Sequence, residues 1–178
     1  MHLLTKLVLG PMLALPIAVL AAENPKLHAP NVVVISETLV TAGQPDRASL
    51  LTLSQQGFQA VVNLAPPTVP DAVTDEASLV RDQGIDYINI PVQWKTPTEA
   101  DFESFVATMN GFAGKKVLVH CQANMRASAM TFLYRVIVAK DDPAKAFESV
   151  EKVWTPEGPW KTLVNEQLHK HEVSFQVL

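Results

Sequence analysis

Apolar and polar positions along the chain follow two periods, which predict alternating strands and helices. Short apolar or β-branched runs, typical of buried strands, lie at 31–36, 58–64, 85–92 and 117–119. Between these runs apolar residues recur at helical spacing, and Gly57 and Gly84 follow two of the predicted helices as stop signals. The alternation predicts an α/β domain with a central, partly parallel sheet flanked by helices.

Local signals predict where several of these elements begin. Asp46 and Thr74 are candidate N-caps, and 41–45 predicts a turn. The segment 96–99 (Thr-Pro-Thr-Glu) is typical of a capping box with proline at the first helical position. Residues 127–140 are apolar nearly all round, which predicts a buried central helix.

The first 21 residues have the pattern of a secretory signal. Lys6 precedes an apolar stretch at 7–20, and Ala21-Ala22 is followed by polar sequence. The stretch is shorter than the ~18–20 residues of a spanning helix and holds two prolines, which disfavours a retained anchor. We therefore expect cleavage of residues 1–21, a single domain at 22–178, a periplasmic or secreted location, and no stable membrane insertion after cleavage.

Composition removes several functional classes. A formal net charge of −4 gives no electrostatic reason to expect nucleic-acid binding. A single cysteine, Cys121, excludes an intrachain disulfide and a cysteine-based zinc cage, and we expect neither a metal site nor a cofactor. In an oxidising compartment a lone thiol is either an inert core residue or a reactive site.

The candidate chemistry lies where the strand at 117–119 meets the long helix. The strand ends at His120, Cys121 opens a tight loop, and Arg126 closes it. Such a junction directs backbone N–H groups and a helix N-terminus at one point, which binds anions and favours thiolate over thiol. The Arg126 fork matches a tetrahedral oxyanion. The alternative is a buried structural cysteine followed by an unrelated arginine, because free cysteine is often buried.

The run Val-Leu-Val-His-Cys at 117–121, followed by Arg126, resembles the signature of the cysteine-based phosphatase superfamily, which includes protein tyrosine and dual-specificity phosphatases. The segments 41–45, 61–64 and 87–92 fall in the order seen in a bacterial branch, similar to the phosphatase-like domain of beta-lactamase-hydrolase-like proteins. The resemblance covers about residues 31–138 and implies a protein-tyrosine-phosphatase-like three-layer fold.

The resemblance implies roles for the loop residues. Cys121 would be the nucleophile that forms a phosphocysteine, and His120 would tune its thiolate. The phosphate cradle would comprise Gln122, Ala123, Asn124, Met125 and Arg126. The implied activity is hydrolysis of a phosphomonoester, so the expected partner is a phosphorylated protein or small molecule.

Three departures from the common signature keep alternatives open. Only four residues separate Cys121 from Arg126, a spacing also similar to the active loop of rhodanese-like sulfurtransferases, which would carry a persulfide on Cys121. No glycine lies in the loop, and Asn124 takes a position where glycine is common; asparagine is the next-best residue for a left-handed turn. Ala127 follows the arginine where many relatives have a hydroxyl, and Ser128 comes one position later.

The general acid is less clearly indicated. Dual-specificity relatives place an aspartate just after the strand that aligns with 90–92, whereas this chain has Gln93 and Trp94 there. Asp101 is the nearest downstream aspartate, although helix capping is the favoured interpretation of Asp101 and of Glu99. Asp71 and Asp75 are further candidates.

The lack of an aspartate after 90–92 leaves a further function open, and Trp94 at that place has two interpretations. If no acid exists, a non-catalytic phospho-ligand-binding protein is a third alternative. Trp94 is interpreted either as the floor of the pocket or as packing at the edge of the core.

Overall fold

The computed structural model describes residues 26–178, so the predicted signal segment at 1–21 lies outside the described residues. A five-stranded sheet in the order β1-β2-β5-β3-β4 forms the centre of the domain. Its strands are β1 (Val33–Ser36), β2 (Leu39–Ala42), β3 (Ala60–Asn63), β4 (Asp86–Asn89) and β5 (Val117–His120). Only the β1–β2 pair is antiparallel, and β2, β5, β3 and β4 run parallel. The predicted partly parallel sheet is confirmed.

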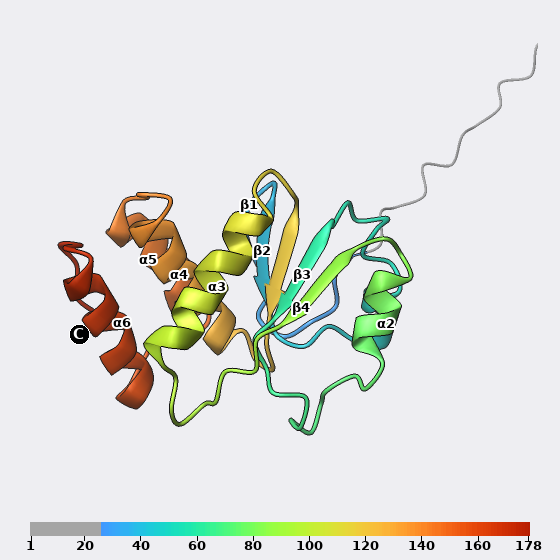
Figure 1. Cartoon of the computed structure of the whole chain (residues 1–178), viewed down its shortest axis with the longest axis horizontal. Coiled ribbons are helices and arrows are strands. Elements are labelled where there is room, and N and C mark those ends of the chain that lie inside the picture. Colours follow the sequence, from blue (N-terminus) through green and yellow to red (C-terminus); the bar gives the residue numbers. More distant parts are fainter. Residues whose placement is uncertain (1–25) are drawn as a thin grey trace, which may run out of the picture.

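Helices cover both faces of this sheet (Figure 1). One face carries α3 (Glu99–Gly111), α4 (Met125–Ile137), α5 (Pro143–Glu151) and α6 (Gly158–Lys170). The other carries the short helices α1 (Arg47–Leu50) and α2 (Glu76–Arg81). The predicted three-layer α/β architecture is therefore confirmed, with β5 in the middle of the sheet.

The apolar runs of the central strands explain the two-sided core. Successive side chains of a strand point to opposite faces. Val117 and Val119 of β5 accordingly pack in the layer beneath α3 to α6, whereas Leu118 packs against the layer of α1 and α2. Strands buried on both faces are apolar without alternation, which is why the β5 sequence indicated a strand so clearly.

The structure corrects the turn predicted at 41–45. Thr41 and Ala42 belong to β2, which pairs with β1 across a tight connection and with β5 from Leu39 opposite Val117 to Ala42 opposite His120. A four-residue strand carries little pattern of its own, and pairing on both sides stabilises it here.

Two helix starts also differ from the prediction. The cap of α3 is Thr98, with Asp101 as the reciprocal residue of the capping box, so the box lies two residues after the one predicted at 96–99. Asp75, rather than Thr74, is the N-cap of α2. The predicted cap at Asp46 is confirmed, because its carboxylate accepts from the Ser49 amide at 2.7 Å.

Candidate active site

Cys121 lies at the junction of the central strand β5 and the central helix α4. Its side chain is buried at the end of β5, and α4 begins four residues later, after Asn124 with φ 67°. A left-handed residue of this kind favours glycine or asparagine, so the asparagine supplies the turn that the loop needs. A cavity of about 320 Å³ is lined by Trp94, Cys121, Gln122, Ala123, Met125 and Arg126.

The structure therefore brings most of the predicted site residues together. Cys121 and Arg126 share the cavity with three of the predicted cradle residues. Asn124 contributes differently, because its side-chain amide donates to the Asn31 carbonyl at 2.6 Å and to the Thr41 hydroxyl at 3.1 Å. The side chain of Asn124 thus ties the loop to Asn31 and Thr41 and does not line the cavity.

Hydrogen-bond donors around the cavity are left unpaired by the protein. An antiparallel bridge between Gly43 and Ala123 ties the loop to the end of β2. Among the described residues, no acceptor is found for the backbone N–H groups of 122, 123 and 125–127, and the first helical bond runs from the Ser128 amide to the Asn124 carbonyl at 2.8 Å. The first turn of any helix has such orphan donors, and the helix dipole adds a positive field. Together they give this junction the donors and the positive field that suit an anion.

Arg126 adds a buried cation to the same cavity. It is 6% exposed, and its Nε has no hydrogen-bond partner in the described part of the chain. Its guanidinium carbon lies 5.4 Å from the centre of the Trp94 ring, a cation–π contact that orients the fork without occupying its N–H groups. The guanidinium is therefore positioned to bind an oxyanion.

Gln44, just after β2, and Asn31, before β1, donate hydrogen bonds to carbonyl groups of the loop. The Gln44 amide donates to the Gln122 carbonyl at 3.0 Å, and Asn31 Nδ2 donates to the Ala123 carbonyl at 3.0 Å. A Cβ on Gly43 would lie 2.8 Å from the Gln122 carbonyl oxygen, closer than packed atoms come. Gly43 is therefore required by the close approach of the two backbones.

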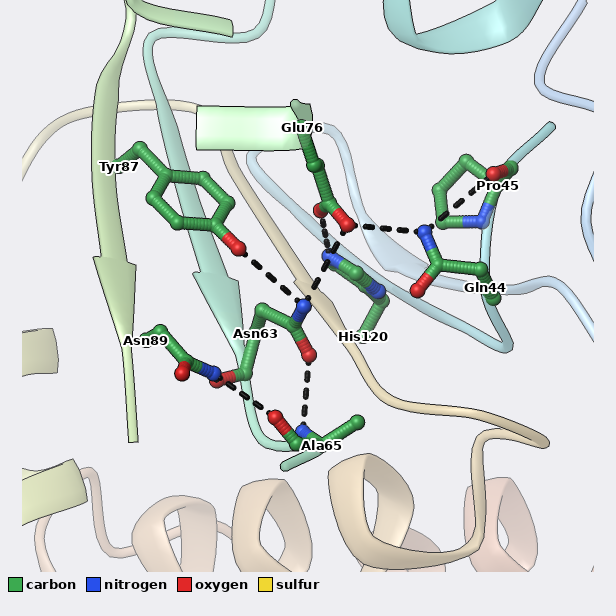
Figure 2. Close-up of polar contacts among 8 residues, drawn as sticks. All are labelled: Gln44, Pro45, Asn63, Ala65, Glu76, Tyr87, Asn89 and His120. Atoms are coloured by element: carbon green, nitrogen blue, oxygen red, sulfur yellow. Dashed lines mark hydrogen bonds and ion pairs between the residues drawn. The ribbon is translucent and has the colours of Figure 1, made fainter. Parts of the chain in front are cut away.

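A buried polar network lies around His120, the residue before Cys121, and includes Glu76 of α2 (Figure 2). His120 is fully buried, and its Nε2 is 2.6 Å from Oε1 of Glu76. The other oxygen of Glu76 accepts from Gln44 Nε2 at 2.9 Å and from Asn63 Nδ2 at 3.4 Å. His120, which the sequence predicts as a site residue, is thus held by a network of side chains that the sequence prediction did not include.

Tyr87, on β4, is the last member of this network. Its hydroxyl oxygen accepts from Asn63 Nδ2 at 3.2 Å. Burial raises the pKa of Tyr87 to about 12, and the negative charge of Glu76 contributes to the same effect. The signal that could have revealed the network is the polar residue that ends each of the apolar strands β3 and β5.

The structure does not bring Asp101 to the cavity. Its Oδ2 accepts from the backbone and from the hydroxyl of Thr98, both at 2.8 Å, which is the capping arrangement. Glu99 pairs with Lys170, Asp75 pairs with Arg47 at 2.5 Å, and Asp71 is exposed. None of these carboxylates is among the residues that line the cavity.

Trp94 has both of the roles that its sequence position suggested. It lines the cavity, and its ring lies 5.4 Å from that of Trp154 and 5.6 Å from that of Trp160. Trp160 Nε1 also donates to the Trp94 carbonyl at 2.9 Å. The wall of the cavity is therefore anchored by aromatic packing from the connection between α5 and α6 and from α6.

Neither a metal-ligand cluster nor a membrane-spanning helix is found in the described part of the chain. Between residues 26 and 178, no group of three or more His, Cys, Asp or Glu side chains is arranged to hold a metal ion. Over the same range, no helix is both long enough and apolar enough to cross a bilayer.

Comparisons with known proteins agree with this geometry. Residues 32–165 match the family model described as "DSP-PTPase phosphatase fused to NAD+ Kinase". A beta-lactamase hydrolase-like protein of Xylella fastidiosa is 33% identical over 114 residues, which are 60% of this chain and 25% of that protein. The chain thus spans about a quarter of the length of the curated relatives it matches.

Solved structures extend the likeness to three dimensions. A putative phosphatase (DUF442) from Shewanella putrefaciens is 34% identical with a TM-score of 0.72, over 80% of this chain and 91% of that one. PTPMT1, solved in complex with PI(5)P, shares 16% identity and the fold, with a TM-score of 0.67 over 79% of this chain and 96% of that one. The resemblance drawn from the sequence is confirmed: the family model spans most of the chain and includes Cys121, so the chain belongs to the DSP-PTPase-like family within the cysteine-based phosphatase superfamily.

Proposed function

We propose that the protein is a periplasmic or secreted cysteine-dependent phosphatase that hydrolyses a phosphomonoester through a phosphocysteine intermediate. The observation that carries the proposal is the set of unpaired donors around the cavity. The N–H groups of 122, 123 and 125–127 and the Nε of Arg126 have no protein acceptors in the described chain, and these residues line the same cavity as Cys121 or lie beside it. A trigonal-bipyramidal phosphoryl group supplies the negatively charged oxygens that such donors bind.

The chemistry follows from this placement in two steps. The Cys121 thiolate attacks phosphorus, the bond from phosphorus to the leaving oxygen breaks, and that oxygen leaves as an oxide or takes a proton from solvent. Water then attacks the phosphocysteine and gives up a proton to solvent, the S–P bond breaks, phosphate is released and the thiolate is regenerated. In both steps the loop amides and Arg126 hold the charge on the equatorial oxygens.

The cavity also suggests which substrates react fastest. No carboxylate lines it, so a leaving group that departs without protonation, such as an aryl oxide, is favoured. The partner we propose is a phosphorylated protein or small molecule, and the PI(5)P bound by PTPMT1 is one phosphorylated ligand taken by this fold.

Hydrolysis of p-nitrophenyl phosphate tests the proposal. Cys121→Ser should lower kcat/KM at least about 1,000-fold, because the nucleophile is lost, while phosphate binding measured by calorimetry persists. Acid quenching during turnover should trap a phosphorylated wild-type protein and no phosphorylated variant. Unchanged turnover in the variant would contradict the mechanism.

The location needs a separate experiment. N-terminal sequencing of the protein from a cell-envelope fraction should begin at Ala22. Recovery of an intact amino terminus from the cytoplasmic fraction would contradict the proposed secretion.

A non-catalytic phospho-ligand-binding protein is the second candidate, favoured by the distance of every candidate acid from the cavity lining. It predicts phosphate binding by wild type and by Cys121→Ser with turnover by neither. Thiosulfate with cyanide tests the sulfurtransferase alternative in the same assay series, and turnover of that pair alone would favour a persulfide on Cys121.

A further inference from the structure

Trp154 lies in the connection between α5 and α6, and its indole contacts two other segments beside the Cys121 cavity. Its ring centre is 5.4 Å from that of Trp94, which lines the cavity and belongs to the connection between β4 and α3. Its Nε1 donates to the hydroxyl of Ser128 at 3.2 Å, in the first turn of α4. Trp154 therefore joins the aromatic wall of the cavity to the helix that follows the Cys121 loop.

The hydroxyl of Ser128 is fully used in this contact. It accepts from Trp154 and donates to the Met125 carbonyl at 3.1 Å. Ser128 is 2% exposed and is not among the residues that line the cavity. The hydroxyl that comes one position late after the arginine thus serves to anchor an indole from another part of the chain.

Trp154 is itself held by the core. Its amide donates to the carbonyl of Val150, a fully buried residue of α5, at 2.9 Å. On its other side Trp94 meets Trp160, whose Nε1 bonds its carbonyl and whose ring centre is 5.6 Å away. Trp94 is 36% exposed, and an exposed side chain keeps its rotamer freedom unless neighbours restrict it. Two tryptophans supply that restriction here.

The orientation of Arg126 depends on this packing. Its Nε has no hydrogen-bond partner in the described part of the chain, and its guanidinium carbon is 5.4 Å from the Trp94 ring centre. Protein acceptors would hold the fork but would occupy the donors that an oxyanion needs. A ring face orients the guanidinium and leaves its N–H groups free. Because Ser128 lies in the same turn as Arg126, the contacts of Trp154 return to the helix that carries the guanidinium.

We propose that Trp154 is a positioning residue that acts through Trp94 to hold the Arg126 guanidinium in the orientation that binds an oxyanion. The proposal rests on the proposed function in taking Arg126 as the group that binds the phosphoryl oxygens. Trp154 does not line the cavity. Its effect requires the indole N–H as well as the ring, because the N–H is the group that ties it to α4.

Binding of inorganic phosphate, measured by calorimetry, tests this without a phosphatase assay. Trp154→Phe keeps an aromatic ring and removes the N–H. The Kd for phosphate should rise about 3- to 10-fold, the effect of one lost hydrogen bond, and kcat/KM for p-nitrophenyl phosphate should fall by a similar factor. Trp154→Ala also removes the ring contact and should raise the Kd about 10- to 30-fold.

Ser128→Ala approaches the same hydrogen bond from its other end. It removes the acceptor and leaves the Trp154 ring intact. The Kd for phosphate should rise about as much as in Trp154→Phe, and the double variant should bind no more weakly than either single variant, because one bond is lost in all three. Losses that add fully in the double variant would overturn the proposal.

Tyr134→Phe is the matched control. It also removes a donor from an aromatic side chain and keeps the ring, but its hydroxyl bonds Asn110 at an exposed site away from the cavity lining. The Kd for phosphate should stay within about twofold of that of wild type. A rise equal to that in Trp154→Phe would overturn the proposal, because the effect would not depend on the contact with Ser128.

The Nε–H signal of Arg126 in a ¹⁵N-labelled protein reads the orientation itself. The ring current of Trp94 shifts this signal, so Trp154→Phe should move it toward its position in Trp94→Ala. An unmoved signal, or an unchanged Kd for phosphate with a lower melting temperature, would make Trp154 purely structural and overturn the proposal. If Trp154→Phe does not fold, Ser128→Ala decides by the same two measurements. Weaker phosphate binding in the variants, with no turnover by wild type, would support the role of Trp154 and contradict the proposed phosphatase.

Discussion

Two groups of buried polar atoms lie on either side of His120, and they differ in where their hydrogen bonds go. Around the cavity, the amides of 122, 123 and 125–127 and Arg126 Nε have no protein acceptors in the described chain. Around Glu76, the side chains of His120, Gln44 and Asn63 converge on one carboxylate. Unpaired buried donors reduce stability and are kept where a ligand uses them, whereas paired ones hold a structure in place.

Variants around the cavity should therefore lower activity more than stability, whereas variants around Glu76 should lower stability more than activity. Among the residues with unpaired donors, Arg126→Ala gives the largest expected effect. It should lower kcat/KM for p-nitrophenyl phosphate by about 100- to 1,000-fold, because charge stabilisation in the transition state is lost. The free energy of unfolding, measured in urea, should change by about 1–2 kcal/mol at most, since the packing of the buried side chain and its contact with Trp94 are lost but no paired donor is left without its acceptor.

Arg126→Lys is the control for this prediction. It keeps the charge and loses the planar fork, so its activity should lie between those of wild type and Arg126→Ala. Full activity in Arg126→Ala would show that the cavity side is not an anion site.

Asn63→Ala should show the reverse behaviour. It removes a donor from Glu76 and leaves the Ala65 amide, now bound to Asn63 Oδ1 at 2.8 Å, without its partner. The free energy of unfolding should fall by about 1–3 kcal/mol, as measured in urea. Asn110→Ala is the control, because its bond to Tyr134 is exposed and its loss should cost at most about 0.5 kcal/mol. Equal losses in the two variants would remove the distinction.

Tyr87 makes the stability of the network around Glu76 depend on pH in the alkaline range. Burial raises its pKa from 10.0 to about 12 in the folded protein, with a further contribution from Glu76. The unfolded chain loses this proton first, so the stability that the neutral phenol contributes is present below pH 10 and declines as pH rises from 10 to about 12.

Urea midpoints measured across that range check this expectation. Tyr87→Phe should show a smaller decline than wild type, because the replaced ring has no proton to lose. Parallel declines in the two proteins would place the alkaline sensitivity elsewhere in the molecule.

Asp101→Ala gives the smallest expected effect and tests a residue outside both groups. The loss of the capping box should cost about 0.5–2 kcal/mol of stability, with kcat/KM for p-nitrophenyl phosphate unchanged within about twofold. An alkyl phosphate is the sharper substrate, because its leaving group needs an acid. A fall of roughly 100-fold or more on that substrate would assign Asp101 as general acid after all.

Local patterns predicted the elements that carry Cys121 and Arg126. The uninterrupted apolar run of β5, the buried helix α4 and the spacing of Cys121 and Arg126 are properties of neighbouring residues, so they are visible in the sequence. Asn124 belongs to the same class, because its left-handed conformation follows from a loop without glycine.

Distant contacts explain what the prediction missed. A glutamate in the first turn of a helix ordinarily faces solvent and favours the helix dipole. Glu76 is buried because its side chain reaches the ends of β5 and β3, where it meets His120 and Asn63, and no local period reports such a contact. The strand β2 was missed for a related reason, since its pairing partner β5 lies more than seventy residues further along the chain.

The contacts that brace the Cys121 loop also bear on the order of folding. Asn31 and Asn124 are joined across 93 residues of sequence, and Asn31 reaches Ala123 across 92. Contacts of such long range close late, because the entropy of a large loop must first be overcome. A partly folded chain therefore lacks the loop geometry around Cys121, which is complete only when the last distant segments have met.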